Sequence, residues 1–164
     1  MKKKITTTSE LLPILEELRR AGRTIVFTNG CFDLLHAGHV RYLRQARQAG
    51  DLLVVGLNSD RSVRGLKGEG RPLVGQAERA ELLAALEMVD YVVIFDEPTP
   101  RNLIKALRPR VLAKGGDWKP EEIAGAEEVE ADGGKVVIVP LVPDRSTSGL
   151  IEKIVARSRS RVEI

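Results

Sequence analysis

The fold is decided by the stretch Thr28-Asn29-Gly30-Cys31-Phe32-Asp33-Leu34-Leu35-His36-Ala37-Gly38-His39-Val40. The apolar run 24–27 before it predicts a buried strand, and the periodicity of 40–47 after it predicts a helix. A strand, a glycine-bearing turn and the start of a helix therefore follow one another. In this arrangement the free backbone N–H groups at a helix N-terminus can face a phosphate.

His36 and His39 are the only histidines of the chain, and they lie three residues apart where this helix begins. If the helix starts near Ala37, both imidazoles can converge on one anion. Gly38 between them lets the backbone approach a ligand closely. By spacing alone, two surface histidines without a chemical role would look the same, so the surrounding residues have to decide.

Residues 30–39 carry a family resemblance. Their sequence resembles the signature of the H-x-G-H nucleotidyltransferases, the cytidylyltransferase-like α/β enzymes. A lone H-x-G-H would be a weak signal, but the ten-residue version after a strand is specific. Over nearly its whole length the chain resembles the heptose 1-phosphate adenylyltransferase domains of this family, in a stand-alone form without a kinase segment. The further matching segments are 65–68, 71–72, 114–118 and 146–148.

Length and composition predict a single domain over residues 1–164. The chain is 43% hydrophobic and 30% charged, and it has no apolar run near the roughly 20 residues of a membrane span. No apolar core follows Lys2-Lys3-Lys4 as a signal peptide would require. The single cysteine, Cys31, excludes an internal disulfide and agrees with a reducing environment. We therefore expect a cytoplasmic protein without a membrane segment.

The net charge of +3 is not spread evenly along the chain. The basic excess lies in the two ends, and the body carries a net charge of roughly −2. With 4% aromatic residues, the chain also lacks a set of stacking platforms for single strands. We therefore expect small-molecule substrates and no nucleic-acid partner.

Strands alternate with helices along the chain. Apolar runs predict strands at 24–27, 51–58, 90–95, 110–113 and 135–139, and periodicity predicts helices at 7–22, 40–47, 76–88, 98–107, 120–131 and 149–156. A capping box from Thr7 to Glu10 opens the first helix, 61–75 is expected to be a mobile loop, and 157–164 a frayed tail. This pattern predicts an α/β fold: a Rossmann-like, doubly wound parallel sheet of about five strands in the order 3-2-1-4-5, with helices on both faces. The ligand site is expected between the ends of the first and fourth strands.

Polar segments outside the signature are candidates for the same site, each with a plainer alternative. Asn58-Ser59-Asp60 ends the second strand at the ligand-binding edge, but it also suits an ordinary turn. The expected loop 61–75 could bring Lys67 and Arg71 to a ligand or simply be solvated. Arg79, near the start of the next helix, could reach the same mouth.

Two later segments extend the candidate site. Lys114-Gly115-Gly116-Asp117-Trp118 follows the fourth strand, where paired glycines suit a close ligand approach; Trp118 is equally compatible with ordinary packing. Ser146-Thr147-Ser148 opens the last helix, where hydroxyls and free N–H groups form a second anion site or an ordinary helix cap.

The family resemblance implies the reaction of D-glycero-β-D-manno-heptose 1-phosphate with ATP to give ADP-heptose and pyrophosphate. Mg²⁺ is expected to arrive with ATP, with no metal site in the protein. The implied catalytic residues are His36, His39 and Lys67. The implied ATP-binding residues are Thr28, Asn29, Phe32, Gly38, Lys114, Gly116, Asp117, Ser146, Thr147 and Ser148. The implied sugar-phosphate residues are Asp33, Asn58, Asp60, Arg71 and Arg79.

Other functions remain open. Glycerol-3-phosphate cytidylyltransferases share the signature but carry an Arg-Thr-x-Gly-x-Ser-Thr-Thr element before the last helix. Leu141 and Val142 occupy its first two positions here, so the arginine is missing and ATP is favoured over CTP. A non-catalytic nucleotide-binding module would keep the same fold. A metal role for the histidine pair is disfavoured, because no further Cys or His completes a ligand set. The apolar first helix and the family habit suggest a homodimer.

Overall fold

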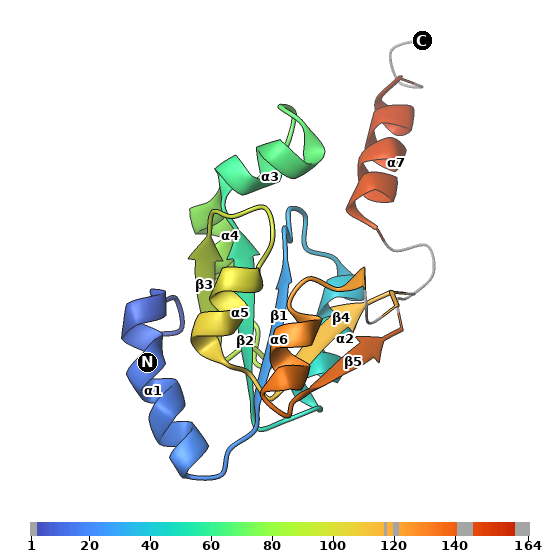
Figure 1. Ribbon diagram of the computed structural model, residues 1–164. Helices are drawn as coiled ribbons and strands as arrows, with labels where there is room; N and C mark the ends of the chain where they lie inside the picture. The colour runs from blue at the N-terminus through green and yellow to red at the C-terminus, as the bar shows by residue number, and fades with distance from the viewer. Residues whose placement is uncertain (1–2, 117, 120–121, 141–145, 160–164) are drawn as a thin grey trace.

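One parallel sheet forms the centre of the protein. The computed structural model describes residues 3–116, 118–119, 122–140 and 146–159. Its sheet has five strands in the order β3-β2-β1-β4-β5, as Figure 1 shows. The strands are β1 (Ile25–Gly30), β2 (Leu52–Asn58), β3 (Tyr91–Phe95), β4 (Val111–Gly115) and β5 (Lys135–Val139). The predicted fold class, strand order and parallel pairing are confirmed.

The central strand β1 explains where the site lies. It pairs with β2 along its whole length and with β4 at Val26 and Phe27. From β1 the chain goes first to one side, through β2 and β3, and later to the other, through β4 and β5. The carboxyl ends of β1 and β4 therefore flank the point where the strand order reverses, which is where open α/β sheets bind ligands.

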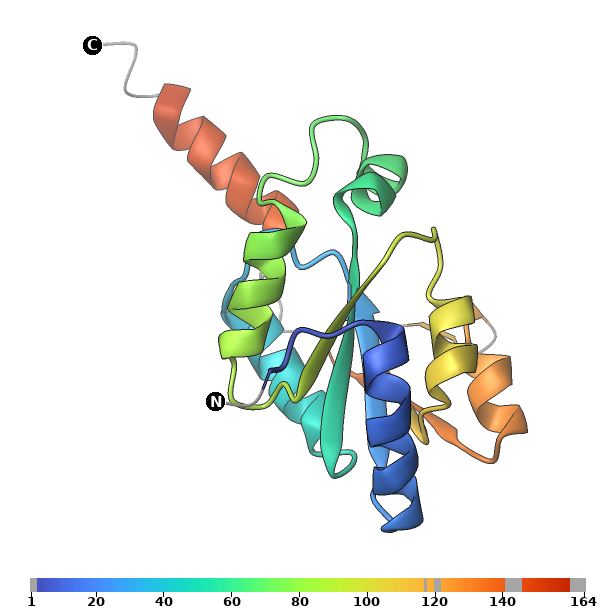
Figure 2. The same ribbon diagram turned by 90° about the vertical axis from the view of Figure 1, so that its left-hand side faces the viewer.

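Helices cover both faces of the sheet (Figure 2). Apolar side chains of α1 (Thr8–Arg20), α5 (Arg101–Leu107) and α6 (Ala126–Ala131) pack on one face, and those of α2 (Ala37–Arg47) and α4 (Gln76–Ala85) pack on the other. All seven residues of β2 are buried. This burial on both sides explains why the strands are continuous apolar runs in the sequence.

The first helix confirms its sequence prediction. The Thr7 hydroxyl accepts a hydrogen bond from the backbone N–H of Glu10, and the Glu10 carboxylate accepts from the backbone N–H of Thr7, so the capping box is complete. Leu11 and Leu15 are fully buried in the core. Just before the helix, Ile5 pairs with Val92 at the outer edge of the sheet. The helix therefore covers a face of the sheet, and the segment before it covers an edge.

The predicted loop 61–75 is wrong in its first half, which is the helix α3 (Asp60–Lys67). The Ser59 hydroxyl accepts a hydrogen bond from the Ser62 N–H and caps its N-terminus. Val63 is buried, and Gly68, with a φ of 95°, ends the helix. Only residues 68–75 form an irregular connection to α4.

The last helix, α7 (Thr147–Arg159), is longer than predicted. It includes residues 157–159, which the sequence analysis assigned to a frayed tail; 160–164 lie outside the described residues. The helix projects away from the sheet in Figures 1 and 2, and none of its residues is buried. Over the ranges that the structure describes, no helix has the length and apolar character needed to cross a membrane.

Candidate active site

A pocket of about 410 Å³ opens at the carboxyl ends of β1 and β4. Five segments contribute its walls: the turn after β1, the first turns of α2, the end of α3 with the residues after it, the end of β4, and the start of α7. The lining residues are Asn29, Gly30, Cys31, Phe32, Asp33, His36, Gly38, His39, Tyr42, Lys67, Arg71, Lys114, Gly115, Trp118, Ser146, Thr147 and Ser148.

The two histidines lie side by side, as their spacing predicted. His36 occupies the N-cap position of α2 and His39 lies in its first turn. Their rings stack with centroids 3.9 Å apart, and the Phe32 ring meets His39 edge-on at 5.3 Å. The Phe32 ring also lies over Gly30, where an added Cβ would come within 3.0 Å of it. Gly30 therefore makes room for the ring that packs against the histidine pair.

The His39 imidazole is neutral at pH 7. Burial, and to a smaller extent the neighbouring His36, together lower its pKa to about 4. A neutral imidazole still offers one N–H donor. A polyanion beside it would favour the protonated form and raise the pKa. The charge of His39 therefore responds to what occupies the pocket.

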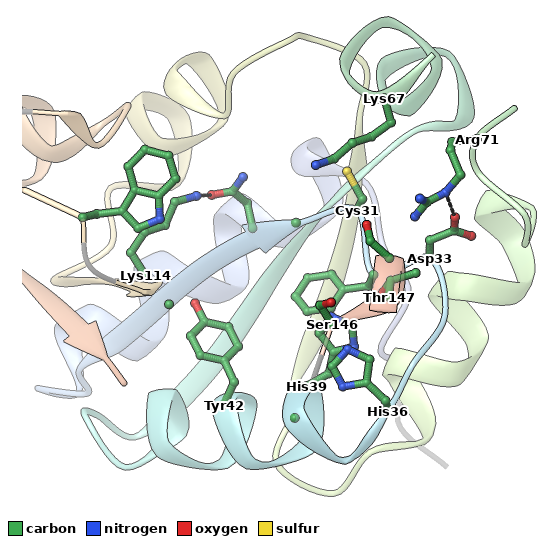
Figure 3. A pocket seen from close by; sticks show the side chains of 17 residues that line it. Cys31, Asp33, His36, His39, Tyr42, Lys67, Arg71, Lys114, Ser146 and Thr147 are labelled. Atoms are coloured by element: carbon green, nitrogen blue, oxygen red, sulfur yellow. Dashed lines mark hydrogen bonds and ion pairs between the residues drawn. The ribbon is translucent and has the colours of Figure 1, made fainter. Parts of the chain in front are cut away.

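Lys67 and Arg71 lie on the other side of the pocket. In Figure 3 their side chains extend toward Cys31 and Asp33, opposite the histidine rings. Lys67 ends α3, and Arg71 follows in the 68–75 segment. Burial raises the pKa of the Cys31 thiol, although nearby cations, Lys67 first among them, act to lower it. An anion in the pocket would thus meet histidines on one side and fixed positive charges on the other.

The Asp33 carboxylate is hydrogen-bonded to other groups of the protein. It is 1% exposed and accepts hydrogen bonds from Arg71 Nε at 2.6 Å, the Leu73 N–H at 2.8 Å and the Val74 N–H at 2.9 Å. Burial alone would raise its pKa, but these donors and the Arg71 charge together lower the pKa below its usual value. Asp33 was expected to contact the sugar phosphate. It lines the pocket, yet its oxygens are engaged with the 68–75 segment instead.

Three other residues expected near the sugar phosphate lie behind the pocket. Arg79 is fully buried, and its guanidinium donates to the Cys31 and Asn58 carbonyls at 2.5 and 2.9 Å and to Asp60 at 2.7 Å. The Asn58 side chain donates to the Ser62 hydroxyl. None of the three is a lining residue. The expectation that Arg79 reaches the mouth is corrected, because its donors are used by carbonyls and a carboxylate below it.

On the β4 side, Lys114 Nζ donates to Asn29 Oδ1 at 2.9 Å and ties the ends of β1 and β4 together. Burial lowers the pKa of Lys114. Gly115 and the half-exposed Trp118 continue the wall. Gly116 lies next to the lining residues but is not one of them. Asp117, expected to bind ATP, lies outside the described residues.

Thr28 lies beneath the pocket rather than in it. Its hydroxyl is fully buried and hydrogen-bonded to the Tyr42 hydroxyl at 2.5 Å, which donates in turn to the Ala113 carbonyl at 3.2 Å. Burial raises the pKa of Tyr42 to about 12. Five lining residues were not among the predicted site residues: Gly30, Cys31, Tyr42, Gly115 and Trp118. For Tyr42 a signal existed, because it follows His39 by three residues and so shares its face of the helix.

The start of α7 closes the remaining side. The Ser146 hydroxyl accepts from the Gly149 N–H at 3.0 Å and caps the helix, as predicted. Thr147 Oγ1 donates to the Leu34 carbonyl at 3.4 Å, which joins this helix to the signature turn. The structure therefore brings the helix cap, the histidine pair and the two cations to one pocket.

The arrangement suits a polyanion with phosphate groups. Two helix N-termini, two imidazoles and the cations of Lys67 and Arg71 surround the same volume. The carboxylate of Asp33, the acidic lining residue, is already paired. In the described ranges, no three His, Cys, Asp or Glu side chains gather into a set that could hold a metal ion. Twelve sequence-predicted residues line the pocket: Asn29, Phe32, Asp33, His36, Gly38, His39, Lys67, Arg71, Lys114, Ser146, Thr147 and Ser148.

Comparison with known proteins agrees with this geometry. A family model described as cytidylyltransferase-like matches residues 27–152. Among curated proteins, the chain is 57% identical to the bifunctional protein HldE of Syntrophotalea carbinolica over 94% of its own length, and 59% identical to that of Geotalea uraniireducens over 92%. It spans about 31% of each of these relatives.

Solved structures show the same fold. The lipopolysaccharide core biosynthesis protein from Thermoplasma volcanium superposes with a TM-score of 0.59 at 28% identity, over 74% of this chain and 98% of that one. The pantoate-beta-alanine ligase from Francisella tularensis reaches a TM-score of 0.62 at 14% identity, over 90% of this chain and 69% of that one. The second match extends the likeness in fold to a more distant protein.

Proposed function

The chain belongs to the cytidylyltransferase-like family, and from this premise we propose that it transfers AMP from ATP to a sugar 1-phosphate. The acceptor we propose is D-glycero-β-D-manno-heptose 1-phosphate, with ADP-heptose and pyrophosphate as products. The choice of ATP and heptose is supported by the resemblance described above and by relatives named HldE that match 92 to 94% of this chain.

One observation carries the proposal. The stacked histidine pair at the start of α2 faces Lys67 and Arg71 across a pocket whose described carboxylate, Asp33, is already paired. Such a site can gather two phosphorylated molecules without repelling them. Its volume of about 410 Å³ lies in the range of small-molecule pockets.

The reaction needs little covalent help from the protein. A phosphate monoester has a second pKa near ~6 and is already an anion at neutral pH, so no general base is required. A phosphate oxygen of the sugar phosphate bonds to the α-phosphorus of ATP while the bond from that phosphorus to the bridging oxygen breaks. Pyrophosphate leaves with that oxygen. Positioning and charge stabilisation therefore carry the catalysis.

Each side of the pocket takes one part of this task. His36, His39 and the N-terminus of α2 bind the triphosphate, and the start of α7 adds the Ser148 N–H and hydroxyl groups. Lys67 and Arg71 stabilise the negative charge around the α-phosphorus and the incoming sugar phosphate. The nucleoside lies toward Asn29, Gly115 and Trp118, at the ends of β1 and β4.

Mg²⁺ would enter as part of its complex with ATP. The described lining residues fit that role and not a dedicated site, since the oxygens of Asp33 already accept three N–H donors. Mg²⁺ commonly keeps several waters and uses substrate phosphates as ligands. Its contribution there is to neutralise phosphate charge. Cytoplasmic ATP would supply this complex, and a reducing compartment would keep the Cys31 thiol of the pocket free.

We also propose that the protein forms a homodimer, through α7. The sequence analysis based the dimer on the apolar first helix, but the apolar side chains Leu11 and Leu15 of α1 are buried against the sheet. The helix α7, of 13 residues, buries no side chain, and Leu150, Ile154 and Val155 on it are exposed. A helix of this length is marginal in water without packing. Light scattering after size exclusion should give twice the chain mass, and Ile154→Glu should shift the protein toward the monomer. A native monomer would contradict this part.

Pyrophosphate release tests the proposed reaction. Purified protein with Mg²⁺ is assayed with ATP or CTP, each with heptose 1-phosphate or glycerol 3-phosphate. Release with ATP and heptose 1-phosphate alone is expected. Release only with CTP and glycerol 3-phosphate would indicate a glycerol-3-phosphate cytidylyltransferase. ATP binding without release in any combination would indicate a non-catalytic nucleotide-binding module.

A further inference from the structure

The 68–75 segment is held to the signature turn from two sides. It contains neither helix nor strand, yet it carries Arg71 and follows Lys67 directly. Its contact point is Val74. The Val74 N–H donates to Asp33 Oδ1 at 2.9 Å, and the Val74 carbonyl accepts from Arg79 Nε, also at 2.9 Å. Both backbone polar groups of one residue are therefore bound by buried charged side chains.

Asp33 binds three points of the segment at once. Besides Val74 it accepts from the Leu73 N–H and from Arg71 Nε. The bond to Nε orients the Arg71 guanidinium and leaves its two terminal nitrogens for other acceptors. Among the described residues, neither terminal nitrogen has a hydrogen-bond partner in the protein, and Arg71 lines the pocket. Asp33 thus presents the forked end of Arg71, which matches phosphate oxygens.

Arg79 holds the same segment from its other side, through the Val74 carbonyl. The guanidinium that donates to Val74 also donates to the Cys31 carbonyl, in the signature turn, and to the Asn58 carbonyl at the end of β2. Asp60 at the start of α3 accepts its remaining described bond. Three stretches of the chain, at Cys31, at 58–60 and at Val74, therefore meet on one buried cation.

Burying both groups is costly unless every polar atom is paired. Asp33 is 1% exposed and Arg79 is fully buried. Charged groups in such positions often contribute little net stability, because desolvation offsets their attraction. Their more direct consequence here is geometric. They fix how far the 68–75 segment lies from residues 31–33.

We propose that Asp33 and Arg79 are positioning residues that hold the 68–75 segment against the pocket, so that Arg71 and Lys67 meet the reacting phosphates in a fixed geometry. Neither residue needs to touch substrate for this role. The inference rests on the proposed nucleotidyl transfer only for the measurement of kcat; the hydrogen-exchange measurement does not depend on it. Misplacing a charge-stabilising group by about 1 Å can cost roughly 10²-fold in rate.

The test compares two variants with a matched control. Asp33→Asn keeps the side-chain volume but replaces one acceptor oxygen by a donor, and Arg79→Lys keeps the charge but cannot reach four acceptors. Asp90→Asn is the control. Asp90 also accepts a backbone N–H, that of Leu53, and pairs with an arginine, Arg47, but it lies just before β3, away from the pocket.

Three quantities are measured on each full-length protein: amide hydrogen exchange of the peptide covering 68–76, kcat for pyrophosphate release, and the Kd for ATP. Asp33→Asn and Arg79→Lys should speed exchange at residues 73 and 74 by about tenfold or more. They should lower kcat by about tenfold or more and change the Kd for ATP less than about threefold. Asp90→Asn should leave all three near the native values.

Two results would overturn the proposal. Lost turnover with native exchange would mean that Asp33 or Arg79 acts on substrate directly, and faster exchange with native kcat would mean that the position of the segment is irrelevant. If both variants fail to fold, exchange of the native protein decides, because residues 73 and 74 must be protected relative to 69–70. If the native protein releases no pyrophosphate, the proposed function fails. Hydrogen exchange then still tests whether Asp33 and Arg79 hold the 68–75 segment.

Discussion

Acidification should destabilise this protein through one half-buried histidine, His39. His39 has a pKa of about 4 in the folded protein, because burial and the adjacent His36 disfavour its charged form. In the unfolded chain its pKa returns to about 6.5. Between these values the unfolded chain binds a proton that the folded protein does not, so the free energy of unfolding falls as the pH falls. Above pH 6.5 this penalty is absent.

The size of the effect follows from the two pKa values. One pKa unit corresponds to about 1.36 kcal/mol, so His39 should cost about 2 kcal/mol at pH 5 and about 3 kcal/mol near pH 4. Other titrating groups act over the same range, so a matched variant is needed. His39→Gln keeps a polar side chain of similar reach but has no titratable proton.

Urea unfolding at pH 7.5 and pH 5 provides the assay. Between these conditions the native protein should lose about 2 kcal/mol more than His39→Gln. A direct readout is the NMR titration of the two imidazoles, which single substitutions assign. A His39 signal that titrates near pH 6.5 in the free protein, or equal pH dependence of the two proteins, would refute the reasoning. Bound ATP should raise the pKa of His39, and calorimetry in buffers of different ionisation enthalpy should then detect proton uptake on binding.

The remaining predictions concern single contacts in the site. His39→Ala should lower kcat by ~10²-fold or more, as removal of a charge-stabilising donor does in other enzymes. Full activity in steady-state pyrophosphate release would show that His39 is not a catalytic residue. Lys67→Ala should reduce kcat by a larger factor than it weakens ATP binding, which calorimetry measures. An equal loss in both would mean that Lys67 only binds ATP in the ground state. Tyr42→Phe should lower the free energy of unfolding by roughly 1–2 kcal/mol, because the Thr28 hydroxyl and the Ala113 carbonyl lose their buried partner. An unchanged urea midpoint would contradict that network.

The sheet was predictable from sequence because β1 to β4 are largely buried and so appear as apolar runs between polar segments. The outer strand β5 is less buried but keeps an apolar run from Val136 to Val139. The capping box of Thr7 and Glu10 was predictable for a similar reason, since its residues act on one another over three positions. The histidine pair was predictable because the helix start itself brings His36 and His39 together. These features depend on local chemistry.

The features that were missed depend on distant partners. The helix α3 buries one large apolar residue, Val63, and three glycines around it hide a helical period. Arg79 was predicted to reach the mouth of the site, because nothing near it in the sequence indicates that the Cys31 carbonyl, 48 positions away, accepts its hydrogen bond. The partners of Asp33 lie 38 to 41 positions along the chain. Tertiary contacts of this kind override local propensity and leave no local pattern.

The most direct measurement of the central claim is a phosphorus NMR spectrum of the protein with Mg²⁺, ATP and heptose 1-phosphate. Transfer of AMP requires the triphosphate and monophosphate signals to fall together while a diphosphate ester and pyrophosphate appear in equal amounts. This is the result that the pocket geometry and the family predict. Formation of ADP with orthophosphate, or an unchanged mixture that still contains bound ATP, would contradict it.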